Sequence, residues 1–245
     1  MKILQLLRDN ATRRPVNLVR NGADATLYIY DVIDPYWGVS APGVIDAIAQ
    51  AGDAATLHVH INSPGGDVFE GRAIMAALGR FSGKTIAHID SLCASAATSI
   101  ALACDEVEMS DGAFFMIHNA SGAVWGDKNA MRETADLLEK IEGAIVNDYV
   151  KKTGLDEAQI VDWMNQESWF SASEALSYGF VDRIAEAPKG AKNTWNLSAY
   201  TKAPESLCKT EPEKLETPPV ETPPEDKKPA MGVANANRLR LLQVV

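Results

Sequence analysis

The sequence has few cysteines and no long hydrophobic run. Its three cysteines, Cys93, Cys104 and Cys208, lack the spacing of a metal site, and the first two lie among apolar residues. We therefore expect the cysteines to be small core residues of a protein in a reducing compartment. No apolar stretch approaches the roughly 20 residues of a membrane span. The run at 3–7 is too short, and too soon followed by charge, for a signal peptide, so we expect a soluble intracellular protein.

Basic residues are outnumbered, because 23 Lys and Arg stand against 33 Asp and Glu, for a formal net charge of −10. A nucleic-acid-binding surface is normally basic, so this balance argues against that class of partner. An apolar fraction of 46% is ordinary for a globular protein. The length of 245 residues allows one substantial domain plus appendages.

Apolar periodicity predicts an α/β domain over residues 26–187. Several strand, strand, helix groups follow one another at similar spacing, which suggests a layered fold of repeated ββα units. Residues 1–25 show no clear period and are expected to form a mobile N-terminal arm. We expect strands over 25–33, 56–61, 86–90, 106–110, 113–118 and 180–184, and helices over 41–50, 68–78, 128–152 and 156–164, with others starting near Ser95 and after Ser171.

Composition changes sharply near Ala203. More than half of the 12 prolines fall within 203–230, with many acidic residues and almost no large apolar side chains. This composition is typical of a disordered or extended segment. We place a Pro/Glu-rich linker at 188–230 and expect residues 231–245, which regain apolar character, to form a docking or tail segment.

The stretch 86–103 is the clearest candidate for chemistry, because it passes from an apolar strand to a helix rich in small residues. Ser95 stands at the junction, where the first helical N–H groups are unpaired and the helix dipole is positive. Its alanine neighbours leave room for another molecule to approach the backbone. An activated serine with an adjacent oxyanion site needs this setting. The alternative is that Ser95 only caps the helix.

Two further segments could complete such a site. The loop 62–67 contains a Pro-Gly-Gly sequence whose bare N–H groups can face a ligand, although it could equally be a plain tight turn. His118 ends a predicted strand beside the loop 119–126. His58 and His60 share one strand face but lack a third ligand at a suitable spacing, so we expect solvent-facing histidines and no metal site.

Four motifs occur in one order over roughly residues 26–186: Ile61-Asn-Ser-Pro-Gly-Gly66, Ala94-Ser-Ala96, Met116-Ile-His-Asn119 and Ser171-Ala-Ser-Glu-Ala-Leu-Ser-Tyr-Gly-Phe-Val-Asp182. In these motifs the sequence resembles the Clp protease proteolytic subunit family (peptidase family S14), within the larger ClpP/crotonase-like fold. The stretch Glu167-Ser-Trp169 and the acidic, Pro-rich extension most resemble the ClpP-like head maturation (prohead) proteases of bacteriophages and prophages.

The resemblance implies roles for individual residues. Ser95 matches the nucleophile, and His118 matches the general base that takes its proton. The backbone N–H groups of Gly66 and Ala96 match the donors of the oxyanion hole.

The third member of the triad is usually an aspartate in this family, and the matching position here is Glu167. A glutamate can hold an imidazole tautomer, but its extra methylene changes the reach. Asp162 is the rival carboxylate, although we expect it on the exposed face of its helix.

The resemblance implies a serine-type endopeptidase, a hydrolase without cofactor, that processes phage scaffold or capsid precursors during head maturation. It further implies a homo-oligomer, in the form of a ring, assembled through the helix at 128–152. The expected location is the cytoplasm of a bacterial host and the interior of the phage prohead.

Three alternatives stay open at this point. One is a housekeeping Clp proteolytic subunit that works with an AAA+ unfoldase. Another is a crotonase-type acyl-CoA enzyme, which shares the fold and oxyanion hole. The third is a non-catalytic assembly protein on the same fold.

Overall fold

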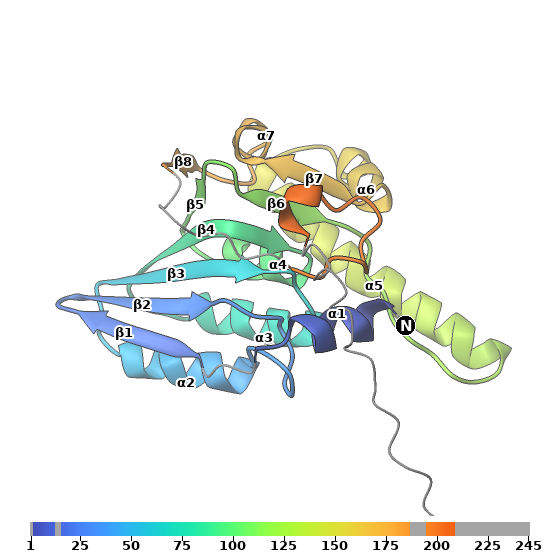
Figure 1. Cartoon of the computed structure of the whole chain (residues 1–245), viewed down its shortest axis with the longest axis horizontal. Coiled ribbons are helices and arrows are strands. Elements are labelled where there is room, and N and C mark those ends of the chain that lie inside the picture. The colour runs from blue at the N-terminus through green and yellow to red at the C-terminus, as the bar shows by residue number, and fades with distance from the viewer. Residues whose placement is uncertain (1, 13–15, 187–194, 209–245) are drawn as a thin grey trace, which may run out of the picture. The chain divides into compact units, whose positions relative to one another are not determined.

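The computed structural model describes residues 2–12, 16–186 and 195–208. Within these residues eight strands form one sheet in the order β1-β2-β3-β4-β5-β8, while β6 pairs with β4 and with β7 (Figure 1). The strands are β1 Asn17–Asn21, β2 Asp24–Ile29, β3 Thr56–Ser63, β4 Lys84–Ala94, β5 Glu106–Ser110, β6 Phe114–Ile117, β7 Ser168–Ser171 and β8 Arg183–Ala185. The helices are α1 Lys2–Asn10, α2 Ala41–Ala51, α3 Val68–Leu78, α4 Ala96–Leu102, α5 Lys128–Thr153, α6 Glu157–Asn165 and α7 Ala172–Ser177, with a short 3-10 turn at Glu205–Leu207.

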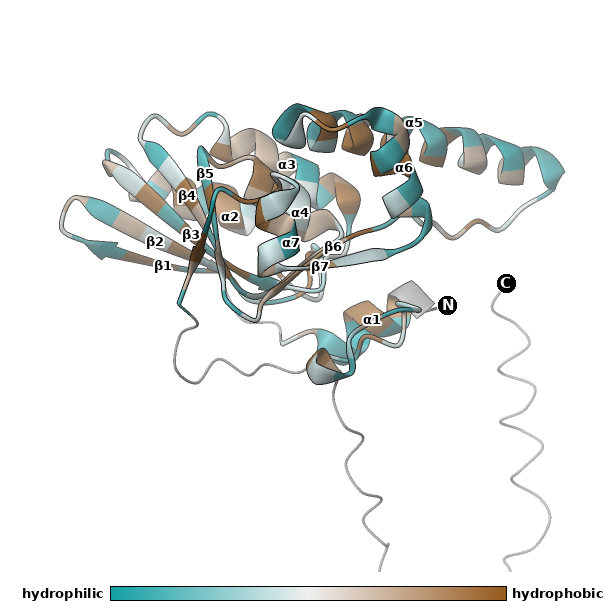
Figure 2. Cartoon of the chain, turned by 90° about the horizontal axis from the view of Figure 1, so that it is seen from above, coloured by the Kyte–Doolittle hydropathy of each residue, from teal (hydrophilic) through white to brown (hydrophobic). Residues whose placement is uncertain are grey.

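Strands β2 to β5 run parallel and are joined by helices, as expected for an α/β fold. Helices α2, α3 and α4 cover one face of the sheet, and α1 lies against the opposite face (Figure 2). The main hydrophobic core lies between the sheet and these three helices and includes Leu57, Val59, Ile74 and Ile100, all fully buried. The α/β class predicted from the sequence is confirmed. No described helix is long and apolar enough to cross a membrane.

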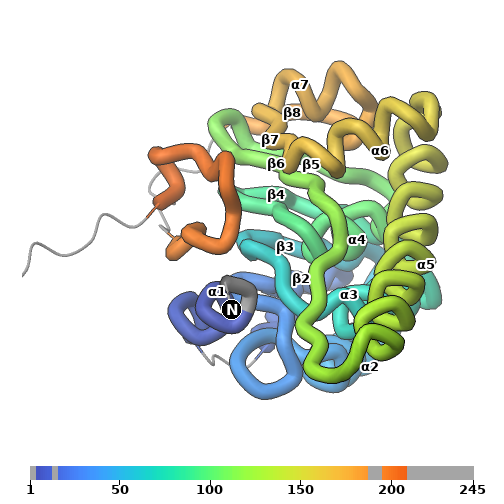
Figure 3. Tube along the Cα trace, turned by 90° about the vertical axis from the view of Figure 1, so that its right-hand side faces the viewer, coloured from blue at the N-terminus to red at the C-terminus, as the bar shows by residue number. Residues whose placement is uncertain are grey.

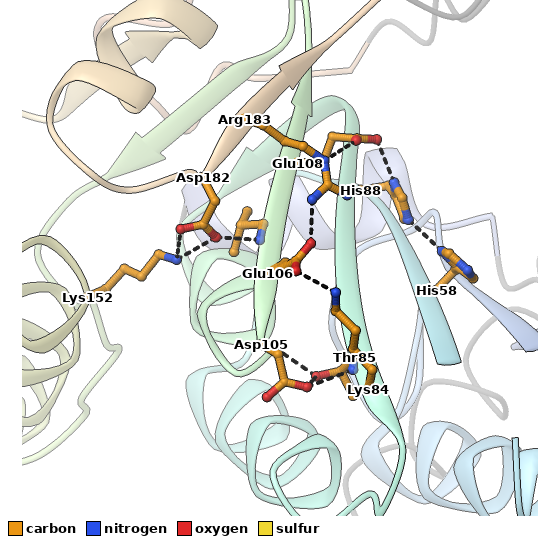
Figure 4. A network of polar contacts seen from close by, with 11 residues as sticks. His58, Lys84, Thr85, His88, Asp105, Glu106, Glu108, Lys152, Asp182 and Arg183 are labelled. Atoms are coloured by element: carbon orange, nitrogen blue, oxygen red, sulfur yellow. Dashed lines mark hydrogen bonds and ion pairs between the residues drawn. The ribbon is translucent and has the colours of Figure 1, made fainter. Parts of the chain in front are cut away.

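Polar side chains form a continuous row on the other face of the sheet. Tyr28, His60, His88, Glu108 and Arg183 are register partners across five neighbouring strands. His88 Nδ1 lies 2.9 Å from Glu108 Oε1, and Arg183 Nε donates to Glu108 Oε2 at 2.6 Å (Figure 4). These contacts link neighbouring strands. His58 and His60 were expected to face solvent, but they are half-buried and bonded to His88 and Asp90. In the part of the chain that the structure describes, no three His, Cys, Asp or Glu side chains are grouped to hold a metal ion.

The N-terminal segment was expected to be a mobile arm, but its described residues contain α1 and β1. Leu6 and Leu7 are buried, so this side of the helix faces the domain, whereas Leu4 is exposed. β1 pairs antiparallel with β2 through a tight turn at Gly22, where φ is +64°. The helix is short, and its burial depends on partners far along the chain, which local periodicity does not reveal.

The central strand β4 is longer than predicted, since it continues through 91–94 where a turn was expected. Its first half pairs with β5, and its last residues, Leu92 to Ala94, pair with β6. This change of partner keeps the backbone extended up to Ser95.

Part of the predicted linker packs on the domain. Residues 195–208 bury Trp195, Leu197, Tyr200 and Leu207 in a second cluster with Leu6 of α1. Figure 3 shows this segment in orange beside α1, on the other side of the sheet from α5. The interspersed aromatic and leucine side chains supply the apolar surface that a disordered linker lacks. The rest of the predicted linker and tail, 188–194 and 209–245, lies outside the described residues.

Candidate active site

Ser95 occupies the junction between β4 and α4. Its backbone has φ +56° and ψ −126°, a conformation that L residues rarely adopt and that costs of order 1–3 kcal/mol. The Ser95 N–H donates to the carbonyl of Met116 at 3.0 Å, which fixes the junction against β6. Its side chain makes no capping hydrogen bond, so the alternative of a simple N-cap does not hold. The hydroxyl is therefore available for another partner.

That partner is His118. Because Ala94 and Met116 are register partners in β4 and β6, the residues that follow them leave the sheet side by side. His118 Nε2 lies 2.7 Å from Ser95 Oγ. When the hydroxyl donates, Nε2 accepts, and the ring proton of the neutral imidazole is on Nδ1. The structure thus brings together the two side chains that the sequence named as nucleophile and base.

The surroundings keep His118 neutral. Burial lowers the pKa of His118 below its usual value of 6.5, because charging a desolvated imidazole is unfavourable. The negative charge of Glu167 opposes this effect in part. At neutral pH the imidazole is therefore a free base, able to accept the proton of Ser95.

Two backbone N–H groups near the nucleophile are the expected oxyanion donors. Gly66 and Ala96 both line the cavity beside Ser95, and neither N–H donates to another group among the described residues. Gly66 has φ +151°, and a Cβ there would lie 2.1 Å from the carbonyl oxygen of Ile33. Only glycine fits at this position. Both residues expected to serve as oxyanion donors thus belong to the lining of the cavity that holds Ser95.

The cavity beside Ser95 has a volume of about 450 Å³. It lies between the glycine loop, the segment 119–123 and α5. Leu137, Leu138, Ile141 and Ile145 of α5 contribute to its lining. An apolar side chain of a bound ligand would be buried here next to the nucleophile.

The structure places the carboxylate of Glu167 on other donors. It accepts from the N–H groups of Thr201 at 2.8 Å and Lys202 at 2.6 Å, from the Thr201 hydroxyl at 2.8 Å and from the Trp169 indole at 3.2 Å. Partial burial would raise the pKa of Glu167, but these donors outweigh it and hold the pKa below its usual value. His118 Nδ1 has no hydrogen-bond partner within 2–12, 16–186 and 195–208, so the expected direct carboxylate contact is not made in this structure.

Two rival groups are placed away from this chemistry. Asp162 is exposed and accepts a hydrogen bond from Gln166 within its own helix. Cys93 is fully buried, and burial raises the pKa of its thiol, so it stays protonated.

Sequence reasoning missed Tyr200 and Thr98. The Tyr200 ring lies edge-on to His118 with centroids 5.3 Å apart, and its hydroxyl donates to the Pro64 carbonyl at 2.5 Å. The Thr98 hydroxyl lies 2.6 Å from both the Ser95 carbonyl and the Tyr149 hydroxyl. The aromatic residues between 195 and 200, before the Pro-rich region, were the one sequence signal for Tyr200. Nothing in the local sequence pattern pointed to Thr98.

Fold and site together define an α/β protein in which a serine hydroxyl is hydrogen-bonded to an imidazole. Two backbone N–H groups at the same cavity have no acceptor among the described residues. Comparison with known sequences agrees with this class. The sequence model of the family described as Clp protease matches residues 44–188. This match covers more than half of the chain, and the chain belongs to the Clp protease family.

Relatives of the same family align over similar lengths. ATP-dependent Clp protease proteolytic subunit 2 of Treponema denticola is 29% identical over 136 residues, covering 54% of this chain and 68% of the relative. The protein of the same name from Bifidobacterium longum is 26% identical over 134 residues, covering 54% of this chain and 65% of the relative. This chain thus spans about two thirds of the length of these relatives.

A solved structure shares the fold. The ClpP1 N165D mutant from Listeria monocytogenes superposes with a TM-score of 0.59 at 23% identity, covering 67% of this chain and 93% of that chain. The matched portion supports the ClpP-like fold predicted from the four motifs.

The lowered pKa of His118 predicts the pH dependence of serine reactivity. Protonation removes the acceptor at Nε2, so labelling of Ser95 by a fluorophosphonate should fall as pH decreases through the pKa of His118. We expect the midpoint of this fall to lie below 6.5, the ordinary imidazole value. Labelling rates measured from pH 5 to 8 check this. A midpoint above 6.5 would show that burial does not dominate.

Proposed function

We propose that this protein is a serine endopeptidase. His118 Nε2 takes the proton of the Ser95 hydroxyl as Oγ forms a bond to the carbonyl carbon of a peptide. The carbonyl oxygen becomes an oxyanion and accepts hydrogen bonds from the N–H groups of Gly66 and Ala96. The contact of 2.7 Å between His118 Nε2 and Ser95 Oγ is the observation that carries this proposal.

The second half of the cycle uses the same groups. The imidazolium returns its proton to the leaving amine, the C–N bond breaks, and an acyl ester on Ser95 remains. Water then loses a proton to His118 and attacks the ester. The imidazolium returns this proton to Ser95 Oγ as the ester C–O bond breaks, which releases the acid and restores the serine. Glu167 contributes its negative charge, which favours the imidazolium form of His118.

Removal of either partner should abolish the reactivity of the serine. We expect fluorophosphonate labelling at Ser95 in the wild type, located by peptide mass spectrometry, and a loss of at least about 1,000-fold in Ser95→Ala and His118→Ala. Cys93→Ala, which removes a buried thiol near the site, is the control and should label normally. Absence of labelling in every variant, including samples in which the protein is assembled, would favour an acyl-CoA enzyme or a non-catalytic assembly protein.

We further propose that the chain forms a homo-oligomer, with a ring as its form. The helix α5 is 26 residues long, and it carries exposed Met131 and Leu137, whose apolar surface suits burial against another subunit. Sedimentation at micromolar concentration should therefore give a mass several times that of the 26.4 kDa chain. A monomer under these conditions would contradict this.

For the substrate we propose phage scaffold or capsid precursors, processed in the bacterial host during head maturation. The glutamate at position 167 and the acidic, Pro-rich extension support this choice. The names of the two relatives favour a second candidate, a proteolytic subunit that depends on an ATPase. Processing of coexpressed head precursors by the wild type, but not by Ser95→Ala, is the expected result. Degradation only with an unfoldase and ATP would replace the first candidate by the second.

A further inference from the structure

The segment 195–208 packs against the candidate active site through Tyr200, whose ring contacts His118. It is joined to the domain at both ends of the site. Asn196 exchanges hydrogen bonds with Asn10 at the end of α1, at 2.6 and 2.8 Å, and the Trp195 indole donates to Asn62 at 3.2 Å. At the other end Glu167 accepts the three hydrogen bonds from Thr201 and Lys202 described above. Tyr200 lies in the stretch between these anchors.

Tyr200 is the residue of this segment that contacts the catalytic histidine. Only 7% of it is exposed, and its ring packs edge-on against His118 at an interplanar angle of 85°. On the other side the ring contacts Trp169 with centroids 5.8 Å apart. The imidazole of His118 therefore cannot tilt toward Tyr200 without displacing its aromatic ring.

The hydroxyl of Tyr200 reaches the loop that carries the oxyanion donor. It donates to the carbonyl of Pro64, two residues before Gly66. Burial raises the pKa of Tyr200 well above its ordinary value, so the phenol keeps its proton and this hydrogen bond throughout the neutral range. One side chain thus contacts both the general base and the oxyanion loop.

The backbone is strained at two residues that this arrangement connects. Among the described residues only Ser95 and Glu167 have a positive φ outside glycine, at +56° and +52°. Such conformations persist where surrounding contacts enforce them, and they cluster at functional sites. One of the two bears the nucleophile, and the other anchors the segment that carries Tyr200.

We propose that Tyr200 is a positioning residue, which Glu167 holds in place through Thr201 and Lys202, and which fixes the imidazole of His118 and the Pro64–Gly66 loop relative to Ser95. This inference rests on the proposed serine endopeptidase function. It assigns to Glu167 the role of an anchor, in addition to its charge, and takes the place of a direct carboxylate contact to Nδ1.

The test combines two measurements on the full chain: the rate of fluorophosphonate labelling at Ser95, and the pKa of His118 from NMR titration of isotope-labelled histidine. Tyr200→Leu keeps apolar volume in the cluster but removes the ring. We expect labelling to slow by roughly 10- to 100-fold, because small misplacements of catalytic groups cost that much. The pKa of His118 should rise toward 6.5 as water reaches the ring. Tyr30→Leu, the same change at a half-buried tyrosine bonded to Asp90 on the polar sheet face, should alter neither value.

Two further variants separate the contributions. Tyr200→Phe retains the ring but removes the hydroxyl, and with it the bond to Pro64 and the polar contact with Ser95. Labelling should therefore slow while the pKa of His118 stays at the wild-type value; Tyr30→Phe is the matched control. Glu167→Asp keeps the charge but shortens the reach to Thr201 and Lys202, so it should behave like Tyr200→Leu. If Glu167 instead contacted His118 directly, aspartate would retain or raise the labelling rate.

The outcomes distinguish the two proposals. Wild-type rate and wild-type pKa in Tyr200→Leu would overturn the positioning role and leave the endopeptidase in place. Equally, an unchanged or faster labelling rate in Glu167→Asp would overturn the anchor. If the wild type shows no labelling but the pKa of His118 rises in Tyr200→Leu, the endopeptidase function fails and the contact between Tyr200 and His118 stands. If neither signal appears, both fail.

Discussion

The pairing of β4 with β6 is the constraint on which the site depends. Ala94 and Met116 are register partners, and the Ser95 N–H is bonded to the Met116 carbonyl. A shift of this register by one residue would turn the side chains to the other face and separate nucleophile from base. The strained backbone at Ser95 is tolerated because β4 lies in the middle of the sheet, with neighbours on both sides. The stability of the sheet thus holds the serine in an unfavourable conformation.

Much of this could be predicted from the sequence, because its causes are local or recur in a known family. The strand-to-helix junction at Ser95 shows in the change from an apolar run to small residues, and the motif around His118 supplied its partner. The α/β class followed from periodicity. The extension of β4 to Ala94 could not be predicted in this way, because it depends on pairing with a strand that comes some twenty residues later in the chain.

Long-range packing explains the remaining differences. The helix α1 and the segment 195–208 are each too short to be stable in isolation. Together they enclose Leu6, Trp195 and Leu207 against the sheet, over separations near 190 residues. A local sequence pattern cannot reveal such mutual burial. The first segment was therefore predicted to be a mobile arm and the second to be part of a linker. The placement of Glu167 follows from the same cause, since its hydrogen-bond donors belong to this segment.

The hydrogen bonds from Thr201 and Lys202 to Glu167 affect how the imidazole of His118 is oriented. A charge-assisted hydrogen bond contributes roughly 1.5–3 kcal/mol and fixes orientation, whereas a charge acting through space favours the imidazolium without fixing its angle. With the Glu167 carboxylate engaged by Thr201 and Lys202, the charge is still present but the angular restraint must come from elsewhere. An aromatic ring packed edge-on against His118 supplies that restraint by exclusion of volume. In this protein electrostatics and orientation of the base are therefore separate functions, carried by Glu167 and Tyr200, that the anchoring hydrogen bonds keep together.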